Sequence, residues 1–321
     1  MIKHCEILAN CDLPDHPSPG YRVERLVGDA STRSYFRITT PAGETMILMK
    51  MPEPFDERQF PYLDNYHLLR GQGIPVAEIE RMEPSRGYVF LQDLGDMTLY
   101  ELYGGWSEQG RLSRLLHSVD LQVRISRIQP ASKLAFDTEK LSWELNFFLE
   151  NFLVVYRGCA LSEDETAELK GQFVRLAGEL AARPGVFCHR DFHSRNLMLA
   201  GETMYVIDFQ DARLGPATYD LASLCYDSYL QHPRGLIEYL ERYFFTFHPD
   251  AETQRWEYPR MRLQRNLKAL GTFGYQAARL GRSFYVQFVD PTLGYVRKHL
   301  ESLPEYSEMS KLLARHLPEL S

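Results

Sequence analysis

Cys188-His-Arg-Asp-Phe-His-Ser-Arg-Asn-Leu-Met-Leu199 and Val206-Ile-Asp-Phe-Gln210 are the two stretches that decide the fold. The first has the form H-R-D-x-x-x-x-N, with Asp191 as its acid and Asn196 as its amide. The second carries Asp208 on a short apolar segment, twelve positions after Asn196. Chance produces the first three letters easily, but it seldom adds the asparagine, the apolar residues after it and the second acid. We expect a tight loop to place Asp191 and Asn196 on one side of a cleft and a hairpin to bring Asp208 opposite.

This spacing suits phosphoryl transfer, which needs positioning, metal ions that neutralise the phosphates and one carboxylate near the acceptor hydroxyl. We predict that Asp191 accepts the proton of that hydroxyl. Asn196 and Asp208 are predicted to give hard oxygen ligands to Mg²⁺. His189 is expected to be structural, with its ring hydrogen-bonded to backbone so that the loop keeps its shape.

Composition indicates a folded enzyme and argues against nucleic-acid and membrane partners. The chain has 321 residues, 44% hydrophobic and 25% charged, enough to bury the cores of two lobes. Its 36 Lys+Arg against 43 Asp+Glu give a net charge of −7, so a nucleic-acid partner is not expected. Signal-peptide and membrane-span patterns are both missing, which predicts a cytoplasmic protein with no membrane contact. No pattern indicates an obligate protein partner.

The cysteines are five in number, scattered, and form no C-x-x-C pair, so reduced thiols are expected. A zinc site built from His4, Cys5, Cys11 and His16 is not expected, because their spacing matches no structural zinc pattern.

Hydrophobic patterning predicts an α+β, two-lobed fold. The expected elements of the small lobe, residues 1–92, are strands at 21–27, 34–39, 44–51, 74–82 and 87–91 and a helix at 55–71. The polar turn at 93–97 is predicted to be the hinge. Residues 98–321 are expected to form a larger, mainly helical lobe, interrupted by short strands near 187 and at 205–207.

The motifs resemble those of the aminoglycoside phosphotransferase and choline kinase superfamily, and among its members the bacterial amino-sugar kinases of cell-wall recycling. Further shared strings are Gly28-Asp-Ala-Ser-Thr-Arg-Ser-Tyr-Phe-Arg37, Asp93-Leu-Gly95, Ile207-Asp-Phe-Gln-Asp-Ala212, Gly215-Pro216, Tyr219-Asp-Leu221 and Gln264-Arg-Asn-Leu-Lys268. This resemblance covers nearly the whole chain and implies the protein-kinase-like fold. It also implies ATP- and Mg²⁺-dependent phosphorylation of a small molecule, with the anomeric hydroxyl of N-acetylmuramate or N-acetylglucosamine as the favoured acceptor.

Nucleotide-binding candidates come from the small lobe, the hinge and the catalytic loop. They are Gly28, Ser31, Thr32, Lys50, Gln92, Asp93 and His193. Lys50 ends Ile47-Leu-Met-Lys50, where the kinase pattern V-A-I-K has its phosphate-binding lysine. The similar amino-sugar kinases tend to have an acidic residue at this position, and Glu57 and Asp64 are both open as the helix acid that pairs with Lys50. His193 and Arg195 either contact the γ-phosphate or are ordinary surface side chains.

The acceptor-binding candidates form two groups, one directly after the second motif and one on a late helix. They are Asp211, Arg213, Gln264, Arg265 and Lys268. Helical spacing puts Gln264 and Lys268 on one face, which is either an acceptor site or a solvated surface. The basic residues Arg265 and Lys268 on this helix favour a neutral or anionic acceptor. Asp220 is expected to be scaffold that hydrogen-bonds the backbone of the catalytic loop.

Two other functions stay open. One is a different small-molecule kinase, acting on an aminoglycoside, choline or homoserine. The other is a nucleotide-binding pseudokinase, although retention of Lys50, Asp191, Asn196 and Asp208 together argues against lost chemistry. Gln210 stands where D-F-G kinases have glycine, which argues against a flipping regulatory loop.

Overall fold

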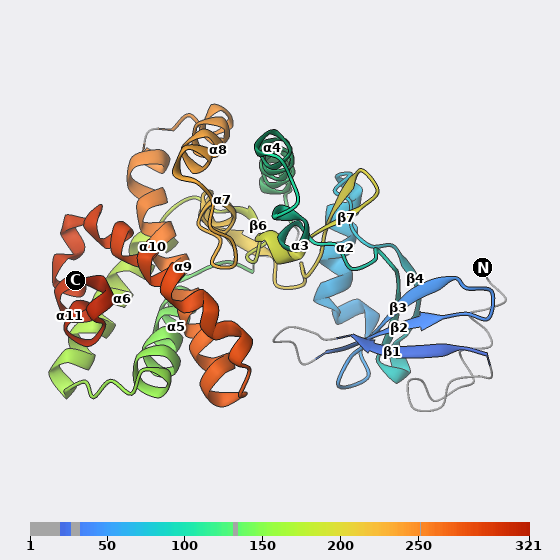
Figure 1. The fold of residues 1–321 in the computed structure, drawn as a ribbon, viewed down its shortest axis with the longest axis horizontal. Helices are drawn as coiled ribbons and strands as arrows, with labels where there is room; N and C mark the ends of the chain where they lie inside the picture. The colour runs from blue at the N-terminus through green and yellow to red at the C-terminus, as the bar shows by residue number, and fades with distance from the viewer. Residues whose placement is uncertain (1–19, 27–32, 131–133, 251) are drawn as a thin grey trace. The chain divides into compact units, whose positions relative to one another are not determined.

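The computed structural model describes residues 20–26, 33–130, 134–250 and 252–321, which form two compact units (Figure 1). The first contains the described residues up to Met97 together with Met198–Gln210. The second contains Thr98–Leu197 and Asp211–Ser321, apart from the residues outside these ranges. The chain therefore returns to the first unit at Met198–Gln210, a segment that the sequence-based boundaries had included in residues 98–321. Within the described residues, no helix is long and apolar enough to span a membrane.

The first unit has one antiparallel sheet with strand order β1-β2-β3-β5-β4. Its strands are β1 (Arg22–Leu26), β2 (Ser34–Thr39), β3 (Thr45–Lys50), β4 (Ile79–Glu83) and β5 (Tyr88–Gln92). Phe36 lies opposite Leu48, and Leu48 opposite Phe90, so alternate residues of three neighbouring strands share one face. That face forms a core of Phe36, Ile38, Met46, Leu48, Tyr88 and Phe90. The five strands are as predicted, although the fourth begins only at Ile79.

Helix α2 (Pro61–Gly71) is the long helix of the first unit. It begins later than residue 55 because Pro61 suits a first helical turn, where its fixed φ fits and its missing N–H is not needed. Before it, Glu57–Gln59 forms a separate 3₁₀ turn. The buried face of α2 consists of Tyr62, Asn65, Tyr66 and Leu69.

A hairpin of β7 (Leu197–Ala200) and β8 (Thr203–Val206) carries the chain back to the first unit. The N–H of Leu199 donates to the Met97 carbonyl at 2.8 Å, and the N–H of Val206 donates to the Pro75 carbonyl at 2.9 Å. The sequence predicted only one strand here, at 205–207, because β7 reads as an apolar continuation of the catalytic loop. Asp208 lies two residues after the end of β8.

The second unit is mainly helical. Its helices are α3 (Leu99–Tyr103), α4 (Glu108–Ser126), α5 (Thr138–Phe148) with a π-helical continuation (Leu149–Tyr156), α6 (Glu163–Ala181), α7 (Tyr219–Cys225), α8 (Arg234–Phe247), α9 (Tyr258–Gly274), α10 (Val289–Glu301) and α11 (Ser307–His316). Short strands β6 (Val186–Cys188) and β9 (Arg213–Gly215) pair antiparallel. Strand β9 was not predicted, because three residues give too short a pattern to recognise.

Helix α9 is the centre of the second unit and packs against α5, α7 and α10 (Figure 1). Its approach to α5 depends on two glycines. A Cβ on Gly271 would lie 2.9 Å from the Phe148 Cα, and one on Gly274 would lie 2.5 Å from the Asn151 carbonyl oxygen. Gln264, Arg265 and Lys268 are all buried on this helix, so a solvated surface, the alternative left open for them, is excluded.

Candidate active site

The catalytic loop is anchored from behind by a carboxylate in the first turn of α7. Asp220, only 2% exposed, accepts hydrogen bonds from the N–H groups of His189 at 2.7 Å and Arg190 at 2.9 Å. The His189 ring accepts a bond from the N–H of Asp191 through Nδ1 at 3.3 Å. Arg190 has a positive φ of 84°, which is costly for a residue with a Cβ. Asp220 and His189 therefore hold the strained turn that presents Asp191.

A second buried carboxylate, Glu144 on α5, holds the side chain of Arg190. Glu144 is 1% exposed and accepts from Arg190 Nη2 at 2.9 Å and from Gln264 Nε2 at 2.9 Å. Burial alone would raise the pKa of Glu144, but Lys268 and Arg190 hold it below the usual value. Glu144 is thus a charged partner for the cations around the loop. Glu144 was not predicted, because α5 also carries Glu139 and Lys140 and no local pattern sets Glu144 apart from them.

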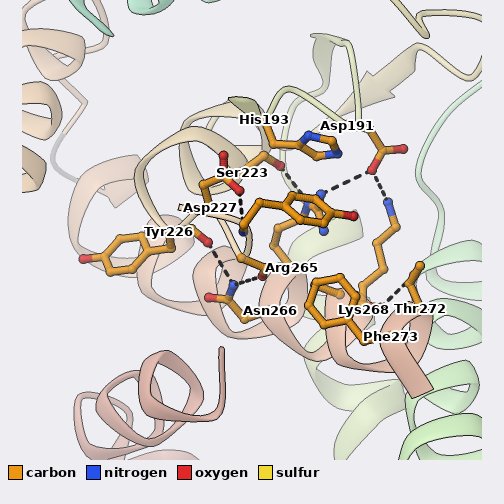
Figure 2. A pocket seen from close by; sticks show the side chains of 13 residues that line it. Asp191, His193, Ser223, Tyr226, Asp227, Arg265, Asn266, Lys268, Thr272 and Phe273 are labelled. Atoms are coloured by element: carbon orange, nitrogen blue, oxygen red, sulfur yellow. Dashed lines mark hydrogen bonds and ion pairs between the residues drawn. The ribbon is translucent and has the colours of Figure 1, made fainter. Parts of the chain in front are cut away.

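The carboxylate of Asp191 is held through one oxygen by two cations of α9. Its Oδ1 lies 2.9 Å from Lys268 Nζ and 3.3 Å from Arg265 Nη2 (Figure 2). Within the part of the chain that the structure describes, Oδ2 has no hydrogen-bond partner. Burial would raise the pKa of Asp191, but Lys268, Arg265 and Arg190 hold it well below the usual value. This geometry fixes one carboxylate oxygen and leaves the other for an incoming hydroxyl.

A pocket opens beside Asp191, bounded by the catalytic loop, the end of α7 with the segment after it, and α9 (Figure 2). Its lining residues are Asp191, His193, Ser223, Tyr226, Asp227, Ser228, Tyr229, Arg265, Asn266, Lys268, Ala269, Thr272 and Phe273. Of the five acceptor-binding candidates, only Arg265 and Lys268 lie in this wall. The pocket thus combines the candidate base with two cations, hydroxyl groups and aromatic rings.

His193 belongs to this pocket and is uncharged. Burial, together with the nearby cations Arg265 and Lys268, lowers its pKa to about 3 against the opposing charge of Asp191. Its ring lies 5.0 Å from the ring of Tyr229. A neutral imidazole can exchange hydrogen bonds with a hydroxyl, but it does not supply the positive charge of a phosphate clamp. Arg195 packs near the rings of Tyr100, Tyr229 and Phe284.

The remaining acceptor-binding candidates do not line the pocket. Gln264 is fully buried and donates to Glu144, so its side chain is part of the scaffold. Asp211 pairs with Arg190 at 3.4 Å and with Arg213 at 3.6 Å. Gln264, Asp211 and Arg213 therefore belong to the charged and polar network outside the pocket, which includes Arg190 of the catalytic loop.

Asp227, by contrast, was not predicted and lies in the pocket wall. It is 1% exposed and accepts from the N–H of Ser194 at 2.8 Å and from the N–H of Tyr229 at 2.8 Å. Burial raises its pKa, while its bonds to Ser194 oppose this effect. It fixes the far end of the catalytic loop as Asp220 fixes the near end. An isolated Asp after an apolar helix gives no distinctive sequence signal.

Asn196 has the chemistry of a magnesium ligand. Its Nδ2 donates to the Asp191 carbonyl at 2.9 Å, and its own N–H donates to the His193 carbonyl at 2.9 Å. The side-chain oxygen is therefore turned away from the loop and available to a hard cation. The described residues contain no group of three or more His, Cys, Asp or Glu that could hold a metal. Magnesium does not require one, because water and substrate phosphates complete its coordination.

Asp208, in the first unit, has a left-handed backbone with φ of 63°. This conformation costs on the order of 1 kcal/mol for a residue with a Cβ. Its Oδ1 accepts from Gln210 Nε2 at 2.9 Å. The carboxylate after β8 is thus presented from a defined turn and fits the hard oxygen donor that the sequence predicted.

The described nucleotide-binding candidates of the first unit lie at the ends of β3 and β5. Lys50 ends β3, with Nζ 5.8 Å from the ring centre of Tyr88, and it forms no ion pair with any described residue, including Glu57 and Asp64. Gln92 ends β5 and bonds to the backbone of Glu78. Gly28, Ser31 and Thr32 lie outside the described residues.

The carboxylate of Asp93 is occupied within the first unit. It accepts from Arg37 Nε at 2.7 Å and Arg37 Nη2 at 3.1 Å, and also from the Gly95 N–H at 2.9 Å. Burial would raise the pKa of Asp93, but the bond to Arg37 lowers it overall. Asp96 also binds Arg37, at 2.8 Å. The side chain of Asp93 is thus committed to holding the segment after β5 against β2.

Comparison with known proteins identifies similar kinases. A protein of Pseudomonas aeruginosa named N-acetylmuramate/N-acetylglucosamine kinase is 30% identical over 296 residues, 89% of this chain and 86% of that protein. Its counterpart of the same name in Pseudomonas putida is 28% identical over 305 residues, 92% and 88% of the two chains. The solved structure of the aminoglycoside phosphotransferase APH(4)-Ia with AMP-PNP and hygromycin B shares the fold. Its TM-score is 0.57 at 16% identity, over 88% of this chain and 94% of that one.

The model of the phosphotransferase enzyme family matches residues 22–263, which include both motifs and all the predicted catalytic and metal-binding positions. This match, together with the 30% identity over most of both chains, confirms the predicted family and the prediction of a small-molecule kinase. The chain belongs to the phosphotransferase enzyme family, and it is a small-molecule kinase.

Proposed function

We propose that this kinase uses ATP and Mg²⁺ to phosphorylate the anomeric hydroxyl of an N-acetylated amino sugar, N-acetylmuramate or N-acetylglucosamine. The observation that carries the proposal is the Asp191 carboxylate in the pocket wall, with Oδ1 held by Lys268 and Arg265. The acceptor is taken from the names of the similar proteins of Pseudomonas. Such a reaction recovers amino sugars from the cell wall inside the cytoplasm, where ATP is available.

In the proposed mechanism, Asp191 Oδ2 accepts a hydrogen bond from the anomeric hydroxyl and orients its oxygen toward the γ-phosphorus. As the new P–O bond forms and the bond to ADP breaks, the hydroxyl proton passes to Oδ2. The low pKa of Asp191 is compatible with this role, because the loose transition state of phosphoryl transfer needs little removal of the proton before the P–O bond forms. Lys268 and Arg265 keep the carboxylate in the required rotamer.

The expected cofactors fit the donors present. The side-chain oxygens of Asn196 and Asp208 would bind Mg²⁺, which neutralises charge on the phosphates when it is bound. Lys50 would pair with the phosphates. Among the described residues, no carboxylate forms an ion pair with Lys50 that would compete with them. An ATP-type nucleotide agrees with the AMP-PNP bound to the solved relative.

The pocket favours an amino sugar over the other acceptors considered. Neutral His193 and the hydroxyl of Ser228 suit sugar hydroxyl groups, and Arg265 and Lys268 suit a carboxylate such as the lactyl group of N-acetylmuramate. A polycationic aminoglycoside would meet both of those cations. Choline would find the rings of Tyr229 and Phe273, but beside positive charge that repels it.

The test measures ADP release with ATP and Mg²⁺ across N-acetylmuramate, N-acetylglucosamine, simple hexoses, choline, homoserine and kanamycin. Turnover confined to the two N-acetyl sugars, with the phosphate on the anomeric oxygen by NMR, is expected. Asp191→Asn should lower kcat by about 10²- to 10⁴-fold, because the amide cannot take the proton. Turnover of another acceptor alone would reject the proposed substrate, and unchanged turnover in Asp191→Asn would reject the catalytic assignment.

A further inference from the structure

Helix α2 directs an amide, Asn65, into the interior of the first unit. Asn65 is 7% exposed, and its Nδ2 donates to the carbonyl of Phe209 at 3.0 Å and to the carbonyl of Gln210 at 3.1 Å. These are the two residues that directly follow Asp208. One side-chain amide therefore holds both peptide groups of the segment that leaves the proposed metal ligand.

The ring of Tyr62 reinforces this contact one turn earlier on α2. It stacks on the ring of Phe209 with centroids 4.8 Å apart, and both rings are buried. The segment being held is conformationally demanding, because Asp208 has a left-handed backbone and its Oδ1 accepts from Gln210. Without an external restraint, the chain after β8 would relax toward commoner backbone angles and move the carboxylate.

The same helix does not act on Lys50. The acid of α2 is Asp64, which is exposed, and among the described residues neither it nor Glu57 pairs with Lys50. The buried polar side chain of α2, Asn65, instead donates hydrogen bonds to the segment after β8. The helix therefore supports a different part of the catalytic machinery from the one that its sequence suggested.

We propose that Asn65 is a positioning residue for the divalent cation, acting through the Phe209 and Gln210 carbonyls to hold the Asp208 carboxylate in its metal-binding orientation. This inference rests on the proposed function of Asp208. A side-chain amide suits the task because its two N–H groups can satisfy two carbonyls at once. A carboxylate cannot donate to them, and an apolar side chain leaves both carbonyls buried and unpaired.

The test compares Asn65→Leu, which is similar in volume but has no donor, with Asp64→Asn, its matched control on the exposed face of α2. Binding of Mn²⁺ in the presence of AMP-PNP is measured by electron paramagnetic resonance, and the Mg²⁺ concentration for half-maximal activity is measured alongside. Asn65→Leu should raise both values by about 10- to 100-fold, as loss of partners behind a metal ligand generally does. Excess Mg²⁺ should restore much of kcat, and Asp64→Asn should behave as the parent protein.

A folded Asn65→Leu with parental Mn²⁺ affinity and Mg²⁺ dependence would overturn the inference, even if its thermal midpoint falls. Should Asn65→Leu fail to fold, Tyr62→Leu removes the ring stack on Phe209 and is expected to weaken Mn²⁺ binding in the same direction. Parental affinity in that variant would reject the inference equally. A parent protein that binds no Mn²⁺ with AMP-PNP would instead reject the proposed metal site.

Discussion

At the residue scale, the central feature is a carboxylate that is held rather than made basic. Asp191 sits between Lys268 and Arg265, which lower its pKa, whereas a general base for a harder proton transfer would need a raised one. The surrounding charges are balanced in turn by Glu144, which binds Arg190. In the proposed mechanism, these buried charges set geometry, which is what phosphoryl transfer chiefly requires.

The charge of Lys268 should limit activity at alkaline pH. Burial lowers its pKa to about 8, with Arg190 and Arg265 adding to the effect and Asp191 opposing it. As pH rises through about 8, Lys268 loses its proton and Asp191 Oδ1 loses one of its two cations. We expect kcat/KM to fall above that pH. Lys268→Arg should move the alkaline limb upward by at least about one pH unit, because a guanidinium stays charged.

A pH–rate profile of both proteins with the same sugar checks this prediction. The active variant Lys268→Arg is the necessary control, since it separates loss of charge from general alkaline inactivation. An alkaline limb at the same pH in both proteins would show that another group causes it.

At the element scale, the position of α9 determines where the cations of the pocket lie. Arg265 and Lys268 reach Asp191 because α9 lies close against α5 and its π-helical continuation, and Gly271 and Gly274 permit that approach. The same packing brings Gln264 onto Glu144. One helix interface therefore serves both stability and the geometry of the site.

Two glycine-to-alanine changes should separate packing from helix propensity. Gly274→Ala is expected to lower the free energy of unfolding by about 1 to 3 kcal/mol, because its Cβ would overlap the backbone of Asn151 and Phe152. At Gly294 on α10, the described residues place no atom within 4 Å of an added Cβ apart from the neighbouring backbone of the helix, so Gly294→Ala should raise stability by about 0.5 to 1 kcal/mol. Urea unfolding measures both changes, and equal effects of the two substitutions would contradict the role of Gly274 in packing.

At the scale of the whole molecule, buried neutral histidines should make the fold sensitive to acid. Burial lowers the pKa of His193 to about 3 and of His232 to about 4, and it holds the pKa of His299 well below the usual value. A folded-state pKa below the unfolded value of about 6.5 gives stability that is complete above pH 6.5 and lost as pH falls toward 4 and 3. Each histidine then costs up to about 1.4 kcal/mol per pH unit.

Thermal unfolding at pH 7.5, 6.5, 5.5 and 5.0 should therefore show a falling midpoint below pH 6.5. Burial raises the pKa of Asp220, Asp227 and Glu257, which opposes the histidines because these acids take up protons in the folded state first. A midpoint that stays level from pH 7.5 to 5.0 would show that the acids compensate fully. His232→Gln should reduce the slope if the histidines dominate.

Local patterns were sufficient for much of this molecule. Alternation, β-branched residues and apolar runs predicted the five strands of the first unit, and the motifs that carry Asp191, Asn196 and Asp208 predicted the family and a small-molecule kinase. These features could be predicted because they depend on neighbours in the chain, where spacing and side-chain type determine what a short segment can do.

Only the tertiary structure decided which distant residues join the motifs. Glu144, Asp227 and Asn65 lie 46, 33 and 144 positions from the residues they bind, and none has a local pattern that sets it apart. Gln264 also does not line the pocket, because α9 packs against α5 and the Gln264 side chain donates a hydrogen bond to Glu144 on α5. Sequence spacing determined the reactive groups, whereas burial and helix packing determined their charge, their orientation and the walls around them.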